Sequence, residues 1–413
     1  MMTGFFRKLP FLLLVLVAGM LVLAACGSDD DGGGAAPTAT QVQEEPKEPI
    51  KVGVIGVLTG PFAGTMGVYK AAMEWELDKI GRTIAGRPIE TIWVDSEGKL
   101  DVALSKAKRL IELDKVDIII GPVHSGVAVG IEDYIGTTAI PWMAPEAGAV
   151  SFYPPANAIR TSATSHHFAM PRIGEVIAEK FGVKKAIIIG LDYAAGHDIV
   201  DATKTILQGG NIEVIQEMFV PLSVTDFGPY ISQMDTDDAQ LLTGAMFGGP
   251  GIRMVNQLHE FGLTDNLRMA FGHAFVLDDF GLADLGDAYA GTLNWFDLPP
   301  INHPSPAFQQ YAAEYKEKFD VWPGYGWRGL TVVNRLVSAI ESIDGNVEDS
   351  AAFIAAMKTP FEMPTGTYTI DACNDAVMPV YLKEVKLVDG KPATTHVEQF
   401  DGARLPCPKP VRG

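Results

Sequence analysis

The sequence predicts an α/β fold made of two units, each a parallel β-sheet covered by helices on both faces. Short apolar segments rich in β-branched residues alternate with longer segments of helical periodicity from residue 51 to about residue 271. The chain of 413 residues is long for one domain, and 47% of them are hydrophobic, enough for two substantial cores. The alternation starts afresh after Arg160, which favours a second unit of similar size.

The first unit begins with a short strand at 51–58 that is rich in valine and isoleucine. A helix is predicted next, at 68–80, because its apolar residues recur on one helical face. The strand, helix, strand, helix and strand that follow are predicted at 89–94, 102–113, 117–120, 127–137 and 140–144. This order of elements is typical of a parallel sheet between two layers of helices.

The second unit repeats the pattern. Its helices are predicted at 171–181, 197–208, 227–234 and 251–261, and its strands at 186–190, 212–219, 240–246 and 268–271. The tail has a strand at 290–295, helices at 306–319, 328–343 and 350–357, and strands near 367–370 and 378–388. Because the tail does not form a third unit, we expect it to complete both others, with crossings near Thr164, Trp295 and Cys373. Several crossings make a hinge, which suits a ligand-closing clamp.

The N-terminus has the features of an export signal. Arg7 and Lys8 precede an apolar run at 9–22, which is short for a membrane span, and Leu23-Ala24-Ala25-Cys26 follows. The last four residues resemble a bacterial lipobox, in which the cysteine becomes the first mature residue and carries lipid. The alternative is an ordinary signal peptide with a chance cysteine. We predict a signal peptide at 1–25 and a flexible, Gly- and Pro-rich tether at 26–49.

Two further cysteines lie near the C-terminus. In an exported protein Cys373 and Cys407 are expected to pair in a disulfide, although two free buried thiols are the alternative. The three cysteines and eight histidines form no metal-site spacing.

The net charge and the missing motifs exclude several functions. A net charge of −19 argues against binding nucleic acid through its phosphates. The glycines near the first strand do not follow a dinucleotide fingerprint, and no phosphate loop, nucleophile elbow or zinc pattern occurs. The sequence therefore predicts neither a cofactor nor an enzyme.

Several segments in order resemble the leucine/isoleucine/valine-binding protein family, the type I periplasmic binding proteins of ABC transporters. The first is Ile50-Lys51-Val52-Gly53-Val54-Ile55-Gly56-Val57-Leu58-Thr59-Gly60-Pro61, and the others are Asp95-Ser96-Glu97, Ile119 to Ser125, Ile140 to Pro145, Leu191 to Asp198, and Gly244 to Phe247. The resemblance covers roughly residues 50–388. It implies two doubly wound, Rossmann-like lobes joined by three hinge strands, with the ligand held between them.

The resemblance places candidate ligand contacts in loops that follow strands, where such sheets bind ligands. Phe62 is expected to wall the pocket, unless it packs in the core. Ser125 matches the residue that contacts the ligand's α-carboxylate, and its alternative role is to cap the helix. Ala147 and Gly148 match a loop that uses backbone groups, and Gly148 stands where a threonine is expected. Glu146 either meets a ligand amine or is solvated.

The second lobe supplies the other candidates. Tyr193 and Phe247 match aromatic contacts of the family, with core packing as the alternative. His273 falls where amino-acid binders carry an acid for the ligand ammonium, so this departure favours a neutral or carboxylate ligand. Trp327, with Tyr325, is predicted to stack on such a ligand or to pack between the lobes.

The resemblance implies an extracytoplasmic solute-binding lipoprotein of a branched-chain-amino-acid-type ABC importer, which captures a small ligand between two closing lobes. Its expected partners are a small ligand (an amino acid, an amide or an aromatic acid), the ABC permease subunits and the membrane that holds the lipid anchor. The lobes are predicted to be 50–164 with 296–372 and 165–295 with 373–413. A ligand-sensing module of a signalling system, which would have the same fold, remains the alternative.

Overall fold

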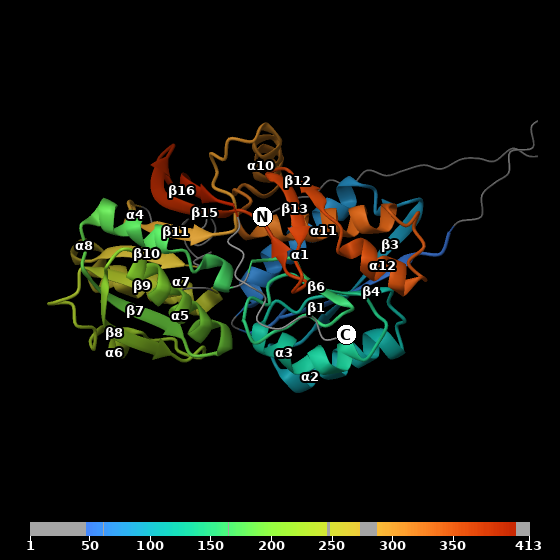
Figure 1. Ribbon diagram of the computed structural model, residues 1–413, viewed down its shortest axis with the longest axis horizontal. Coiled ribbons are helices and arrows are strands. Elements are labelled where there is room, and N and C mark those ends of the chain that lie inside the picture. The colour runs from blue at the N-terminus through green and yellow to red at the C-terminus, as the bar shows by residue number, and fades with distance from the viewer. Residues whose placement is uncertain (1–46, 61, 164, 246–247, 273–286, 402–413) are drawn as a thin grey trace, which may run out of the picture. The chain divides into compact units, whose positions relative to one another are not determined.

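The computed structural model describes residues 47–60, 62–163, 165–245, 248–272 and 287–401. Its α/β architecture has two large sheets with helices on both faces, as predicted, and a small third sheet (Figure 1). The N-terminal residues, including Cys26, and the C-terminal residues, including Cys407, lie outside the described residues.

The first sheet has six strands. In order across the sheet they are β2 (Thr83–Ile84), β3 (Arg87–Asp95), β1 (Ile50–Gly56), β4 (Ile118–Ile120), β5 (Trp142–Ala144) and β6 (Ala158–Arg160). All neighbouring strands are parallel except β2 and β3. Alternate residues of β1 serve different cores: Val54 faces the cluster that contains α1 (Ala63–Lys79), and Ile55 faces the cluster that contains α2 (Leu100–Glu112) and α3 (Ser125–Gly136). Two helix layers therefore cover the sheet.

The second sheet has seven strands. Their order is β16 (Lys391–Phe400), β15 (Val380–Val388), β11 (Leu293–Phe296), β10 (Arg268–Gly272), β9 (Leu241–Ala245), β7 (Lys185–Leu191) and β8 (Glu213–Val220). The last five are parallel, and β15 and β16 join as an antiparallel hairpin. One face packs on α4 (Pro171–Phe181) and α5 (Ala194–Gly209), and the other on α6 (Gly228–Ile231) and α7 (Gly248–Glu260), which the short α8 (Leu263–Asn266) follows.

The tail returns the chain to the first sheet and back again. After β11, the helices α10 (Pro306–Phe319), α11 (Trp327–Glu341) and α12 (Ser350–Met357) join the α1 side of the core. Three short strands follow, β12 (Phe361–Met363), β13 (Gly366–Ile370) and β14 (Ala376–Val377), before β15 enters the second sheet. The chain thus passes between the sheets three times. The residue limits of the two lobes remain a prediction.

Helix α11 lies unusually close to α1. A Cβ atom on Gly329 would lie 2.5 Å from the backbone nitrogen of Met73, nearer than real Cβ atoms approach. Glycine is therefore required at this crossing, because it alone lets the two backbones come so near. The close contact fixes the start of α11 against the middle of α1.

A buried acid on α1 makes stability depend on pH. Glu76 is 5% exposed, and its Oε2 lies 3.7 Å from Lys79 Nζ. Burial raises the pKa of Glu76 to about 7, Lys79 lowers it and Glu314 raises it further. Because the folded-state pKa exceeds the unfolded value, the contribution of Glu76 to stability is complete below that unfolded value. It is lost as the pH rises through about 7.

We expect Glu76→Gln to increase the free energy of unfolding at pH 8, relative to the unmodified protein, by on the order of 2 kcal/mol. At pH 4 the two proteins should differ little. Urea unfolding at both pH values measures the effect, with the exposed Glu317→Gln on α10 as the control. An equal change at pH 4 and pH 8 would contradict the assignment.

Candidate functional site

Three loops at the carboxyl edge of the first sheet gather the predicted contacts. Phe62 follows β1, Ser125 follows β4, and Ala147 with Gly148 follows β5. Because β1, β4 and β5 are parallel neighbours, their carboxyl ends share one edge. The first-lobe residues that the sequence predicted are therefore brought together.

The N-terminus of α3 offers hydrogen-bond donors at this edge. His124 is the N-cap, and its Nδ1 accepts from the N–H of Val127 at 3.3 Å. The buried Ser125 hydroxyl accepts from the N–H of Ala149 at 3.2 Å, which leaves its own hydrogen available to donate. The first N–H groups of a helix have no acceptor within the helix. Together these donors suit a carboxylate.

A row of rings connects the first lobe with the second. The ring centroids of Phe62 and His124 are 5.5 Å apart, edge to face, and those of His124 and Tyr193 are 5.6 Å apart. Tyr193 is the N-cap of α5, just after β7 of the second sheet. Burial lowers the pKa of His124, so the imidazole is neutral at neutral pH. The row therefore forms an uncharged aromatic wall.

A hydrogen bond also joins the lobes beside this wall. The backbone N–H of Val150 donates to Asp198 Oδ2 at 2.9 Å. Val150 belongs to the loop that holds Ala147 and Gly148, and Asp198 lies in the first turns of α5. The two lobes thus meet at the loop expected to contact the ligand.

A buried ion cluster lies next to the contact loops. Arg328 Nε is 2.5 Å from Glu146 Oε2, and Arg328 Nη2 donates to Asp297 Oδ1. Arg328 and Asp297 are almost fully buried, and the Glu146 side chain is 15% exposed. Burial raises the pKa of Glu146, Arg328 lowers it, and Asp297 raises it. Glu146 is therefore paired within the protein, so the solvated alternative was wrong.

Two tyrosines face the same charges. Burial is the main cause of the raised pKa of Tyr69 and of Tyr325, and the Glu146 carboxylate raises both further. Tyr325 lies two residues before the start of α11 and Tyr69 lies in α1, so the close α1–α11 contact brings both to the ion cluster. Tyr69, Arg328 and Asp297 were not predicted from the sequence. The sequence signal that could have indicated this cluster was Arg328, a charged residue at the otherwise apolar start of the helix predicted at 328–343.

Arg160 fixes the shape of the contact loop. Its Nη1 donates to the carbonyls of Ala147 and Ala149 at 2.7 and 3.0 Å, and its Nη2 to that of Phe152 at 2.5 Å. Its Nε donates to Asp375 Oδ1 at 2.8 Å. Burial raises the pKa of Asp375 to about 6, although Arg160 lowers it. One guanidinium thus ties the loop to the tail of the chain.

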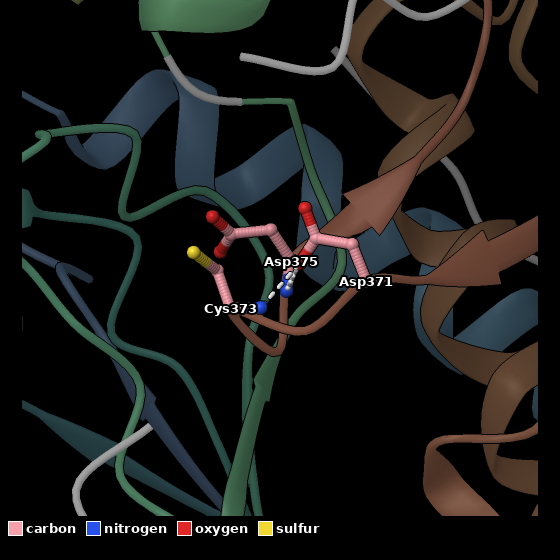
Figure 2. Close-up of side chains that lie close together, drawn as sticks. All are labelled: Asp371, Cys373 and Asp375. Carbon is pink, nitrogen blue, oxygen red and sulfur yellow. Dashed lines mark hydrogen bonds between the residues drawn. The ribbon is translucent and has the colours of Figure 1, made fainter. Parts of the chain in front are cut away.

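Asp375 belongs to a tight turn with Asp371 and Cys373. Asp371 Oδ1 accepts from the N–H groups of Cys373 and Asp375 at 2.8 and 3.0 Å (Figure 2). The sulfur and the two carboxylates lie within 4.8 Å of one another, as in a metal site. Cys373, however, is disulfide-bonded, so its sulfur is no thiolate ligand, and Asp375 is paired with Arg160. This cluster stabilises a turn. The pairing with Cys407 remains a prediction.

The structure does not bring every predicted residue to this site. Trp327 is fully buried and packs against Phe308 and Tyr311 of α10, with ring centroids 5.4 and 5.5 Å apart. Phe247 and His273 lie outside the described residues. Along the described part of the chain, every helix is too short or too polar to cross a bilayer.

The sequence matches a family described as "Periplasmic binding protein" over residues 49–391. The chain belongs to the type I periplasmic binding protein family. Members of this family are solute-binding proteins, so a solute-binding role follows for this periplasmic binding protein as well.

The matches between this periplasmic binding protein and its relatives cover most of this chain and nearly all of each relative. The Leu/Ile/Val-binding protein homolog 6 of Brucella melitensis is 25% identical over 365 residues, which cover 85% of this chain and 92% of the relative. A solute-binding protein of an ABC transporter from Rhodopseudomonas palustris BisB5, solved in complex with 3,4-dihydroxybenzoic acid, is 28% identical with a TM-score of 0.78. The match covers 86% of this chain and 98% of that one. An ABC transporter substrate-binding protein from Sphaerobacter thermophilus is 26% identical, with a TM-score of 0.76 and the same coverage.

Proposed function

We propose that this periplasmic binding protein is the extracytoplasmic, lipid-anchored binding component of an ABC importer for a small aromatic carboxylate. Its lobes, 50–164 with 296–372 and 165–295 with 373–413, close over the ligand. The carboxylate is bound first by Ser125 and the backbone of residues 147–148. Tyr193, with Phe247, then covers the ring from the second lobe, and the energy of these added contacts stabilises the closed state.

The observation that carries the proposal is the row of Phe62, His124 and Tyr193 beside the N-terminus of α3. Flat, uncharged side chains suit an aromatic ring, and the adjacent N–H and hydroxyl donors suit its carboxylate. Further support comes from the relative that is 28% identical and binds 3,4-dihydroxybenzoic acid. The ABC transporters named for this relative and for the Sphaerobacter protein support a permease as partner.

A thermal-shift screen followed by calorimetry tests the ligand class. We expect benzoate or a hydroxybenzoate to stabilise the mature protein, since a ligand at a hundred times its dissociation constant adds about 2.7 kcal/mol. Leucine, phenylalanine and benzamide serve as the competing amino acids and amide. Binding of any of these in preference to all the aromatic acids would contradict the proposal.

The lipid anchor makes a separate prediction. Acylated Cys26 would hold the protein on a membrane, because each buried methylene contributes about 0.8 kcal/mol. We expect Cys26→Ser to move the protein from the membrane fraction to the soluble extracytoplasmic fraction and to abolish incorporation of labelled fatty acid. Cys373→Ser, which leaves the lipobox intact, is the matched control. Unchanged labelling of the Cys26→Ser protein would rule out the anchor.

A further inference from the structure

Two buried polar atoms at the ion cluster form no hydrogen bond with the described residues. Within the described part of the chain, the hydroxyl of Tyr69 and Nη1 of Arg328 have no hydrogen-bond partner. Tyr69 is 0% exposed and Arg328 is 1% exposed. Burying such groups unpaired is costly, and most buried polar groups in proteins find a partner. A partner from outside the chain would satisfy both.

The two atoms belong to one neighbourhood. Tyr69 lies one turn before Met73, where α1 touches Gly329, and Arg328 is the residue before that glycine. The charges of both Glu146 and Arg328 act on the Tyr69 hydroxyl. Glu146 in turn begins the loop that carries Ala147 and Gly148, and it also acts on Tyr193. The unused donors therefore border the candidate site on the side of α1 and α11.

We propose that Arg328 Nη1 and the Tyr69 hydroxyl form a subsite for a neutral hydroxyl group on the ligand, remote from its carboxylate. The inference rests on the proposed function and extends it to ring-hydroxylated aromatic acids. A ligand hydroxyl accepts from the guanidinium and shares its own hydrogen with the Tyr69 oxygen, so both buried groups gain a partner.

The charges around Arg328 favour a neutral ligand group at this subsite over a charged one. Glu146 and Asp297 already contact its guanidinium; Asp297 is fully buried, and the Glu146 side chain is 15% exposed. A ligand carboxylate would be a third negative charge beside one cation, in a place where charges are poorly solvated. A hydroxyl adds no charge. The carboxylate is accommodated at Ser125 and the N-terminus of α3, where the described donors are uncharged.

The test compares two ligands that differ only in their hydroxyl groups. We expect the mature protein to bind 3,4-dihydroxybenzoate more tightly than benzoate in calorimetry. Tyr69→Phe, which deletes one hydroxyl, should weaken 3,4-dihydroxybenzoate binding by about three- to tenfold and leave benzoate binding unchanged. The combination of protein and ligand changes forms a double-mutant cycle that isolates the contact.

Two controls separate this contact from general damage. Tyr311→Phe removes another buried hydroxyl, on α10, that has no hydrogen-bond partner among the described residues, and it should alter neither affinity. Arg328→Lys should reduce the preference for the hydroxylated acid, whereas Arg335→Lys, at a buried arginine further along α11, should preserve it.

The possible results distinguish the two proposals. If benzoate and 3,4-dihydroxybenzoate bind equally well, or Tyr69→Phe weakens both alike, the subsite is refuted and the proposed function stands. If tyrosine binds more tightly than either acid, Glu146 receives an ammonium and both proposals fall. Both proposals also fall if neither acid binds.

Discussion

Replacing Arg160 by methionine should lower the free energy of unfolding by about 3–5 kcal/mol, because it breaks a buried ion pair and leaves one charge uncompensated. The same change removes the hydrogen bonds to the carbonyls of Ala147, Ala149 and Phe152. The contact loop then loses its fixed shape, so ligand affinity should fall as well. Urea unfolding and calorimetry measure the two effects.

The loss should depend on pH in a defined direction. Burial already raises the pKa of Asp375 to about 6, and without Arg160 it rises further. A carboxyl whose folded-state pKa is raised destabilises the fold as the pH increases through that value. Arg160→Met should therefore be more damaging at pH 8 than at pH 5, and adding Asp375→Asn should restore part of the loss at pH 8.

Arg172 provides the control for Arg160. It contacts three carboxylates, of Glu175, Glu179 and Glu398, but it lies at the surface. Exposed ion pairs contribute little to stability, so Arg172→Met should change unfolding far less. If Arg160→Met and Arg172→Met lowered the free energy of unfolding equally, burial of the Arg160–Asp375 pair would not explain its contribution to stability.

Replacing Tyr193 by alanine should weaken binding of the tightest aromatic acid by about 30- to 100-fold. The loss of a partly buried ring, of its aromatic contact and of its contact with the ligand corresponds to about 2–3 kcal/mol. Tyr193 extends the row of rings into the second lobe. Its replacement therefore removes the contacts that the second lobe makes with the ligand when the lobes close. Calorimetry with purified protein gives the change directly.

The aromatic ring of Tyr193, rather than its hydroxyl, should account for this effect. Tyr193→Phe is therefore expected to keep most of the affinity. Tyr230→Ala removes a half-buried tyrosine from α6 of the same lobe, and it should leave affinity unchanged. If Tyr193→Ala binds as well as the unmodified protein, the ring does not cover the ligand.

The sequence predicted most of the architecture because periodicity reports burial directly. The helices α4, α10 and α12 have the predicted limits, and most of the parallel strands of the two large sheets lie at the apolar runs predicted between helices. The strand β6 and the hairpin partner β16 were missed, as were the very short strands β2, β12 and β14. Residues 158–160 are too few to show a period, and β16 carries many polar residues because only part of it is buried.

The candidate site was predicted less completely than the fold. Loops after parallel strands pointed to Phe62, Ser125 and Tyr193, since topology alone places such loops at one edge. The Arg328 cluster joins residues from a contact loop, from the end of β11 and from α11, which are far apart in the sequence. A single sequence carries no record of which distant charges are paired, so the pairing of Glu146 with Arg328 was not among its predicted alternatives.

Asp297 holds two of the three passages between the sheets together. Its Oδ2 accepts from the N–H of Ala163, in the first passage, and Asp297 itself opens the second. This hydrogen bond ties together segments that are 134 residues apart in the chain. We expect the lobes to rotate about a single hinge axis. The protein would then have few conformations between the open and closed states.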